Sequence, residues 1–180
     1  KTGVSMMACK KALVEAEGDE EKAIEILRKR GEAKSADKAA RATGEGGVGI
    51  KIESGKAAIA SIRCETDFVA KSEDFKKASH EICLHIAAAK PLFISEDEIP
   101  EEFLDGEKKI YNKQMEDSGK PQEILDKIIN GKLAKYKKEV SLLSQEWVKD
   151  TSKTISDLVD EVKAKTGENI QIGKFARFEI

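Results

Sequence analysis

Side chains that usually carry chemistry are scarce in this chain of 180 residues, where aromatics make up 5% and there are two histidines and three cysteines. Cys9, Cys64 and Cys83 are widely separated, odd in number and outside any CxxC or Cys/His spacing. That pattern disfavours both a disulfide framework and a structural zinc site. We therefore expect reduced, buried cysteines that behave as small apolar side chains.

Long apolar runs are also missing. No window approaches the roughly 18 consecutive apolar residues of a membrane-spanning helix, and the segment from Lys1 to Lys11 lacks the apolar stretch of a secretory signal. We expect no membrane partner and a cytoplasmic location in a bacterium, or alternatively an organelle matrix or stroma after removal of a transit peptide. Because the chain opens on Lys1 rather than Met, we also expect a fragment or a processed form.

The chain also lacks an excess of charge of either sign. Charged side chains make up 37% of the chain, but 32 basic residues are matched by 34 acidic ones and the net charge is −2. This balance removes the basic field of a non-specific nucleic-acid binder, while a local basic patch stays open. With 39% hydrophobic residues, the length allows one compact domain or two small ones.

The first 33 residues predict a small helical module. Ser5 is a suitable N-cap for a helix that closes at Gly18, and Asp19 is suitable for a second helix that ends at Gly31. Two such helices bury too little surface to be stable alone, so the module at residues 1–33 is incomplete without a helix before Lys1. Residues 34–46 have almost no bulky apolar side chains and predict a helical or flexible linker.

Residues 47–180 predict a core domain with a three-stranded antiparallel sheet. Apolar and polar residues alternate on both sides of the turn Ser54-Gly55-Lys56, which predicts a β-hairpin. The alternation returns from Ile170 to Ile180 and predicts a third strand that joins the hairpin.

Four helices are predicted between these strands, each from apolar residues at helical spacing. They are a run capped by Ser72 that stops at Pro91, one from Pro100 to near Gly119, one from Pro121 to Leu143 that is either continuous or divided at Asn130-Gly131, and one capped by Thr151 or Ser152 that stops at Gly167. The predicted fold class is α+β, with a sheet covered by helices after a small helical module.

No motif of covalent chemistry is present. The sequence lacks GxxxxGK[ST], GxGxxG after a strand, HExxH and GxSxG. Cys83 and His85 are two residues apart on one predicted helix and point roughly 200° apart around its axis, which disfavours a nucleophile–base pair. We therefore expect no enzymatic activity, cofactor or metal, and an acyl-transfer enzyme centred on Cys83 is the weakest alternative.

Thr66-Asp67-Phe68-Val69, between the second strand and Ser72, has two interpretations. Thr66 or Asp67 can cap the coming helix while Phe68 and Val69 pack beneath it as a staple. Alternatively, because Ser72 already supplies a cap, Asp67 and Phe68 form an exposed acid beside an exposed aromatic, which suits a pocket on a partner protein.

Three other residues are open to both a structural and a contact role. His85 lies about 60° from the centre of its helix's apolar stripe, which places it at the edge of the core. Met6 and Met7 are adjacent and cannot both face inward, and methionines at a helix start suit an adaptable contact surface.

Four separated segments together carry a resemblance to a known family. They are Thr2 to Leu13, Thr66 to Val69, His85 to Pro91, and Ser118 to Pro121. In this order they make the chain similar to translation elongation factor Ts over essentially its whole length, in a short form with a single core. The amino end departs from the family by lacking the usual first helix of its ubiquitin-associated-like module.

The resemblance implies a function and roles for the candidate residues. It implies guanine-nucleotide exchange on elongation factor Tu, with GDP release promoted through contacts that disturb the magnesium and phosphate site of the GTPase domain. Asp67 and Phe68, within Thr66-Asp67-Phe68-Val69, match positions that enter a gap between helices of that domain. His85 matches a contact near the phosphate-binding loop, and Met6 and Met7 match contacts of the amino-terminal module.

Two further possibilities concern partners. A non-enzymatic RNA-binding or structural adaptor would use a basic face formed by Lys132, Lys135, Lys137 and Lys138, although such clusters are usually solvated helix surface. The final strand, Ile170 to Ile180, leaves a homodimer open because it can lie at a sheet edge that pairs with a second copy.

Overall fold

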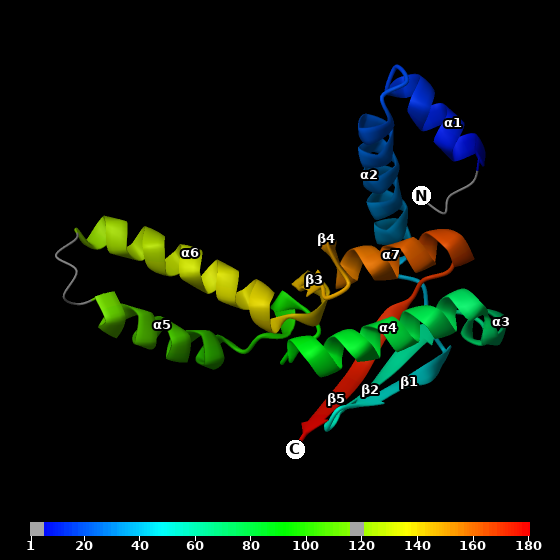
Figure 1. The fold of residues 1–180 in the computed structure, drawn as a ribbon. Helices are drawn as coiled ribbons and strands as arrows, with labels where there is room; N and C mark the ends of the chain where they lie inside the picture. Colours follow the sequence, from blue (N-terminus) through cyan, green and yellow to red (C-terminus); the bar gives the residue numbers. More distant parts are fainter. Residues whose placement is uncertain (1–5, 116–120) are drawn as a thin grey trace. The chain divides into compact units, whose positions relative to one another are not determined.

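The computed structural model describes residues 6–115 and 121–180 of the chain (Figure 1). They divide into two compact units, one of residues up to Ala87 together with Ser156–Ile180, the other of Ala88–Ile155. The sequence did not indicate this second unit within the predicted core, and the predicted domain boundaries stay predictions. Ser5 and Gly119, a predicted cap and a predicted stop, lie outside the described residues. Over residues 6–115 and 121–180, no helix is long and apolar enough to cross a bilayer.

In the first unit, α1 (Met6–Glu15) and α2 (Glu20–Lys38) form a helical pair. Their contact is made of small side chains, with Ala12, Ala16 and Ala23 buried and Ile26 and Leu27 packed against them. Gly18 closes the turn with φ +88°, a left-handed conformation that favours glycine.

The predicted end of the second helix at Gly31 was wrong, since α2 continues to Lys38. A single glycine costs a helix about 1 kcal/mol relative to alanine, which does not end a helix whose neighbours are good helix formers. The helix therefore covers the first residues of the predicted linker.

The same unit contains the predicted three-stranded antiparallel sheet, in the order β1 (Glu45–Glu53), β2 (Lys56–Cys64) and β5 (Gln171–Glu179) (Figure 1). β1 and β2 form a hairpin in which Glu53 pairs with Lys56. The α+β class and the joining of the final strand to this hairpin are confirmed.

Three helices complete this unit: α3 (Asp67–Lys71), α4 (Glu73–Ala89) and α7 (Ile155–Thr166). α4 packs on one face of the sheet, where a Cβ atom at Gly49 would lie 2.8 Å from Sγ of Cys83. Arg177 of β5 donates from Nε to the carbonyl oxygen of Ala87, at 2.9 Å. The predicted start of the last helix was wrong, since Thr151 and Ser152 lie in a strand.

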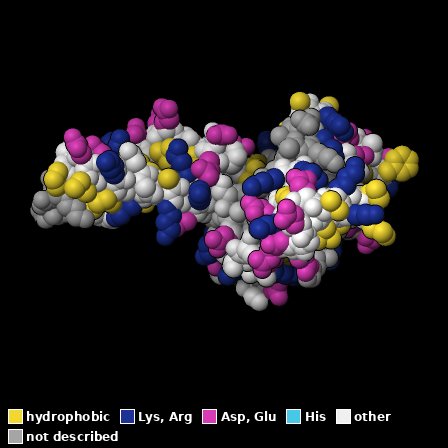
Figure 2. Space-filling model, turned by 90° about the horizontal axis from the view of Figure 1, so that it is seen from above, with side chains coloured by type: hydrophobic (Ala, Val, Ile, Leu, Met, Phe, Trp, Pro, Cys, Tyr) yellow, Lys and Arg dark blue, Asp and Glu magenta, His cyan; other side chains and the backbone are white. Residues whose placement is uncertain are grey.

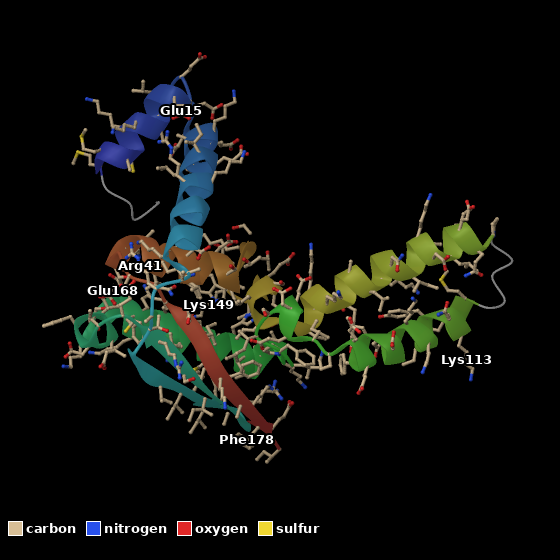
Figure 3. The ribbon with its side chains drawn as sticks, turned by 180° about the vertical axis from the view of Figure 1, so that it is seen from behind. Glu15, Arg41, Lys113, Lys149, Glu168 and Phe178 are labelled. Carbon is tan, nitrogen blue, oxygen red and sulfur yellow. The ribbon has the colours of Figure 1, made fainter. Side chains whose placement is uncertain are left out.

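The opposite face of the sheet is apolar and exposed. Val48, Ile50 and Ile52 of β1 are 63%, 58% and 76% exposed, and the register places Ile59 of β2 opposite Ile50. Phe178 of β5, labelled in Figure 3, is 66% exposed and pairs with Ala57 of β2. The side chains of alternating residues therefore bury one face against α4 and leave the other uncovered.

The second unit is built on the antiparallel helices α5 (Glu101–Met115) and α6 (Gln122–Val140). Phe103 of α5 stacks with Tyr136 of α6, with ring centres 6.0 Å apart, and so joins the two helices. It also packs edge-on to Phe93, which precedes α5, at 5.3 Å. Of the two possibilities left open for Asn130-Gly131, the continuous helix is the one observed, because α6 runs through both residues.

A short ribbon of β3 (Glu146–Trp147) and β4 (Asp150–Thr154) follows α6 and was not predicted. The predicted third helix also ends earlier than expected, at Val140, and Leu143 lies in a 3-10 turn. A two-residue strand gives too short an alternation to be detected in a sequence.

Candidate protein-contact site

The segment from Thr66 to Val69 forms the start of a helix of its own. Thr66 is the N-cap of the five-residue helix α3, with extended backbone angles (φ −127°, ψ 155°), and its Oγ1 accepts a hydrogen bond from the amide of Val69 at 3.4 Å. Ser72 then ends α3 and begins α4, because its hydroxyl donates to the carbonyl oxygen of Val69 at 2.7 Å and accepts from the amide of Phe75 at 3.3 Å.

The two interpretations of this segment are therefore each correct in one respect. Thr66 does cap a helix, and Ser72 caps the next one. Phe68, however, is 82% exposed and does not pack beneath α4 as a staple. An aromatic side chain that is exposed on a capped helix offers a large apolar surface to another protein at little cost in conformational freedom.

Asp67 lies beside Phe68 in the first turn of α3. Its Oδ2 atom is 2.6 Å from Nζ of Lys71, one turn later, and the side chain of Asp67 is half-exposed while that of Lys71 is exposed. The hydrogen bond from Lys71 lowers the pKa of the Asp67 carboxyl below its ordinary value. Asp67 is thus a negative charge at neutral pH, placed where the dipole of α3 also favours one.

The backbone that leads into α3 is held by Glu168, between α7 and β5. One carboxylate oxygen, Oε2, accepts from the amides of Glu65 and Thr66, each at 3.0 Å, and Oε1 accepts from the hydroxyl of Thr66 at 2.6 Å. Glu65 in turn accepts from the amide of Asn169 at 2.6 Å, and Nη1 of Arg41 lies 3.5 Å from the same Glu65 oxygen. Figure 3 labels Arg41 and Glu168 in this region.

His85 lies in the core of α4 and not at its edge. Its side chain is completely buried, as are its neighbours Ile82 and Ile86. The expectation that His85 lies at the edge of the core was therefore wrong. The contact implied by the resemblance requires that the imidazole be uncovered in the complex, and this role stays a prediction.

Met6 and Met7 lie at the start of α1 and are 86% and 64% exposed. Met6, together with Cys9, Leu13 and Val14, lines an open groove on that helix. Both methionines are thus exposed, and their role in a contact with a partner stays a prediction. Met6, Phe68 and His85 belong to three different helices.

None of the three cysteines forms a disulfide, and two of the three are buried as expected. Burial raises the pKa of the Cys83 thiol, and burial followed by the charge of Glu168 raises that of Cys64. Cys9 is half-buried, not buried. Raised pKa values make Cys64 and Cys83 poor nucleophiles, because the thiolate is the reactive form.

Across the described ranges, no group of three His, Cys, Asp or Glu side chains could hold a metal ion.

The basic residues of α6 are partly engaged within their own unit. Nζ of Lys132 lies 5.2 Å from the centre of the Tyr111 ring, and Nζ of Lys135 lies 3.5 Å from Oε1 of Glu139. At 100° per residue, Lys137 points about 140° away from Lys132 around the helix, so the cluster does not form one face. Figure 2 shows basic and acidic side chains interspersed on the face in view.

Sequence reasoning missed the residues that hold the candidate site in place. Glu168, Glu65 and Asn169 form their hydrogen bonds across more than 100 positions of sequence. The only local sign was a polar pair directly after the predicted stop at Gly167. Such a pair indicates a turn and does not reveal its distant partner.

Comparison with known proteins gives a consistent result. The family model described as Elongation factor TS matches residues 76–180. A protein named Elongation factor Ts from Thermosipho melanesiensis is 45% identical over 100% of this chain and 93% of its own length. Those from Maridesulfovibrio salexigens and Caldanaerobacter subterraneus are 50% and 49% identical, covering 100% and 99% of this chain and 88% and 90% of their own lengths.

The fold and the site together define an α+β protein that presents Asp67 and Phe68 at the start of a short helix, where the N-cap residue is hydrogen-bonded to Glu168. The three-stranded sheet alone would not identify the family, since one fold can serve many functions. With the matches over the whole chain, the assignment is direct: the chain belongs to the elongation factor Ts family of translation elongation factors.

Proposed function

We propose that the protein is a guanine-nucleotide exchange factor for elongation factor Tu and acts by binding, without covalent chemistry. The observation that carries this proposal is the 82% exposure of Phe68 on a helix whose start is fixed by hydrogen bonds. An aromatic residue held in this way is suited to enter a pocket on the GTPase domain. The bacterial relatives favour the cytoplasm as the place where it acts.

Exchange requires that the factor bind the nucleotide-free GTPase more tightly than the GDP-bound form. By linkage, each roughly 1.4 kcal/mol of this preference weakens GDP binding tenfold. Burial of Phe68 in a partner pocket would contribute about 1.5–3 kcal/mol, and only the part gained in the nucleotide-free state drives release.

Asp67 would act by its charge. Its ion pair with Lys71 is exposed, so a cation or an amide of the partner can compete for the carboxylate at little cost. We propose that Asp67 holds polar groups of the partner in an arrangement incompatible with its magnesium shell, while Phe68 fills the adjoining apolar space.

The test is the release of a fluorescent GDP analogue from elongation factor Tu at increasing concentrations of the chain. We expect Phe68→Ala to weaken the stimulation of release by about ten- to hundredfold, which corresponds to the loss of the apolar contact. The melting curve should not change, because Phe68 is exposed in the free chain.

Leu92→Ala is the matched control, since Leu92 is an exposed apolar residue of the second unit, 55% exposed. This variant should release GDP as the parent does. Equal release by Phe68→Ala and the parent would reject the proposed function of Phe68. If the unsubstituted chain did not stimulate release at all, exchange itself would be rejected.

A further inference from the structure

We infer that Glu168 is a positioning residue for the Phe68 contact, because its carboxylate fixes the backbone at the start of α3. The consequence for GDP release rests on the proposed function. We call the three hydrogen bonds from Glu65 and Thr66 to this carboxylate the Glu168 brace. The brace is present in the free chain and can be tested without a partner.

One carboxylate makes three of the hydrogen bonds at this corner. Oε2 of Glu168 accepts from the consecutive amides of Glu65 and Thr66, and Oε1 accepts from the hydroxyl of Thr66 at 2.6 Å. An ionised acceptor forms hydrogen bonds roughly twice as strong as a neutral one. The side chain of Glu168 therefore fixes both the direction of the backbone and the rotamer of the N-cap residue.

The brace is reciprocal, which makes it stiffer than a single contact. Glu168 holds the backbone of the corner after β2, and Glu65 of that corner holds the amide of Asn169 in the corner after α7. Nδ2 of Asn169 also donates to the carbonyl oxygens of Ala39 and Arg41, at 3.3 and 2.9 Å. Three segments that are distant in sequence thus meet at one set of polar contacts.

The position of Phe68 depends on this brace because α3 is short. A helix of five residues is not stable by itself, so its direction is set by what holds its ends. The Thr66 oxygen that donates its proton to Glu168 is the same oxygen that accepts from the amide of Val69. Loss of the carboxylate would release this cap, and Phe68, the second residue of the helix, would lose its fixed direction.

The experiment measures GDP release from elongation factor Tu with Glu168→Ala, Phe68→Ala and the double variant. We expect Glu168→Ala to raise the concentration for half-maximal release by about tenfold or more, since misplacement of a contact group by an ångström can cost a hundredfold. In the Phe68→Ala background the same substitution should have a smaller effect, limited to the part that comes from the displacement of Asp67. Glu102→Ala, at an exposed glutamate of α5, is the control and should match the parent.

A second measurement needs no partner. Hydrogen exchange of the amides of Glu65 and Thr66, followed by NMR, should become faster in Glu168→Ala, because both amides lose their acceptor. The amide of Ile180, which donates to the carbonyl oxygen of Gly55 in the hairpin turn, should be unchanged. If Glu168→Ala does not fold, Glu168→Gln keeps one acceptor oxygen and should show the same changes to a smaller extent.

The outcomes separate the two proposals. An equal loss of exchange activity in the parent and Phe68→Ala backgrounds would overturn the positioning role, as would unchanged amide exchange at Glu65 and Thr66. If Phe68→Ala released GDP as fast as the parent, the proposed role of Phe68 would fail, and amide exchange alone would then decide whether Glu168 holds the corner.

Discussion

Nζ of Lys71 lies 2.6 Å from Oδ2 of Asp67, so the last residue of α3 forms an ion pair with its first. The pair spans the whole helix and leaves Phe68, between the two, exposed. The hydrogen bond to Lys71 is the main reason why the pKa of Asp67 is low, and the same bond raises the pKa of Lys71. Replacing Lys71 should therefore change the titration of Asp67 without changing the fold.

We predict that Lys71→Gln raises the pKa of Asp67 toward its ordinary value. In the folded parent this pKa is depressed, so the ion pair contributes above the unfolded pKa of about 3.9 and is lost as the pH falls through the folded pKa. NMR titration of the Asp67 carboxyl between about pH 2 and about pH 6 measures this change in pKa directly.

Lys77→Gln serves as the control, because Lys77 is an exposed lysine of the neighbouring helix α4. It should leave the pKa of Asp67 nearly unchanged. If Lys71→Gln left this pKa where the parent has it, the ion pair would not exist in solution.

The amount that could be predicted from the sequence differs between the sheet and the site. β1, β2 and β5 were predictable because each is nine residues long and alternates over its length. The end of α2 and the start of α7 were not predictable, because Gly31 does not end a helix by itself and the strand before Ile155 is polar. Element types thus follow from period, while ends depend on tertiary contacts.

For the site, the sequence indicated Asp67 and Phe68 but not what positions them. An acid next to an aromatic in a short connection is visible as a local pattern. The Glu168 brace is not, since it joins residues about a hundred positions apart through backbone groups that every residue has. His85 was placed at a core edge because a 3.6-residue period gives only the angle around α4, not the depth to which neighbours cover it.

The two histidines of α4 provide an internal comparison of buried and exposed positions. His85 is completely buried, whereas His80 is exposed on the same helix. We predict that His85→Ala lowers the free energy of unfolding by about 2–4 kcal/mol, because it leaves a cavity in the core. His80→Ala should change it by about 0.5 kcal/mol or less.

Urea unfolding followed by circular dichroism measures both values. The contact role implied for His85 makes a further demand, since uncovering the imidazole in a complex would cost part of the same energy. Equal stability of His85→Ala and His80→Ala would show that His85 is at the surface in solution.

α4 comes so close to β1 at Gly49 that this position has no room for a side chain. A Cβ atom there would lie 2.8 Å from Sγ of Cys83 and 2.9 Å from the carbonyl oxygen of Ser79, both shorter than van der Waals contact. We predict that Gly49→Ala lowers the free energy of unfolding by about 1–3 kcal/mol, the usual cost of overpacking a core. Gly44→Ala, where a Cβ atom would have no neighbour within 4 Å, is the control.

The partner of the clash can be identified with a third variant. Cys83→Ala removes the sulfur but leaves the Ser79 carbonyl oxygen in place, so the double variant should lose less stability than the sum of the two single ones, without full recovery. Strict additivity of the two losses in urea unfolding would mean that the sulfur does not meet the new methyl group. A stability of Gly49→Ala equal to that of Gly44→Ala would place α4 farther from β1 than this structure does.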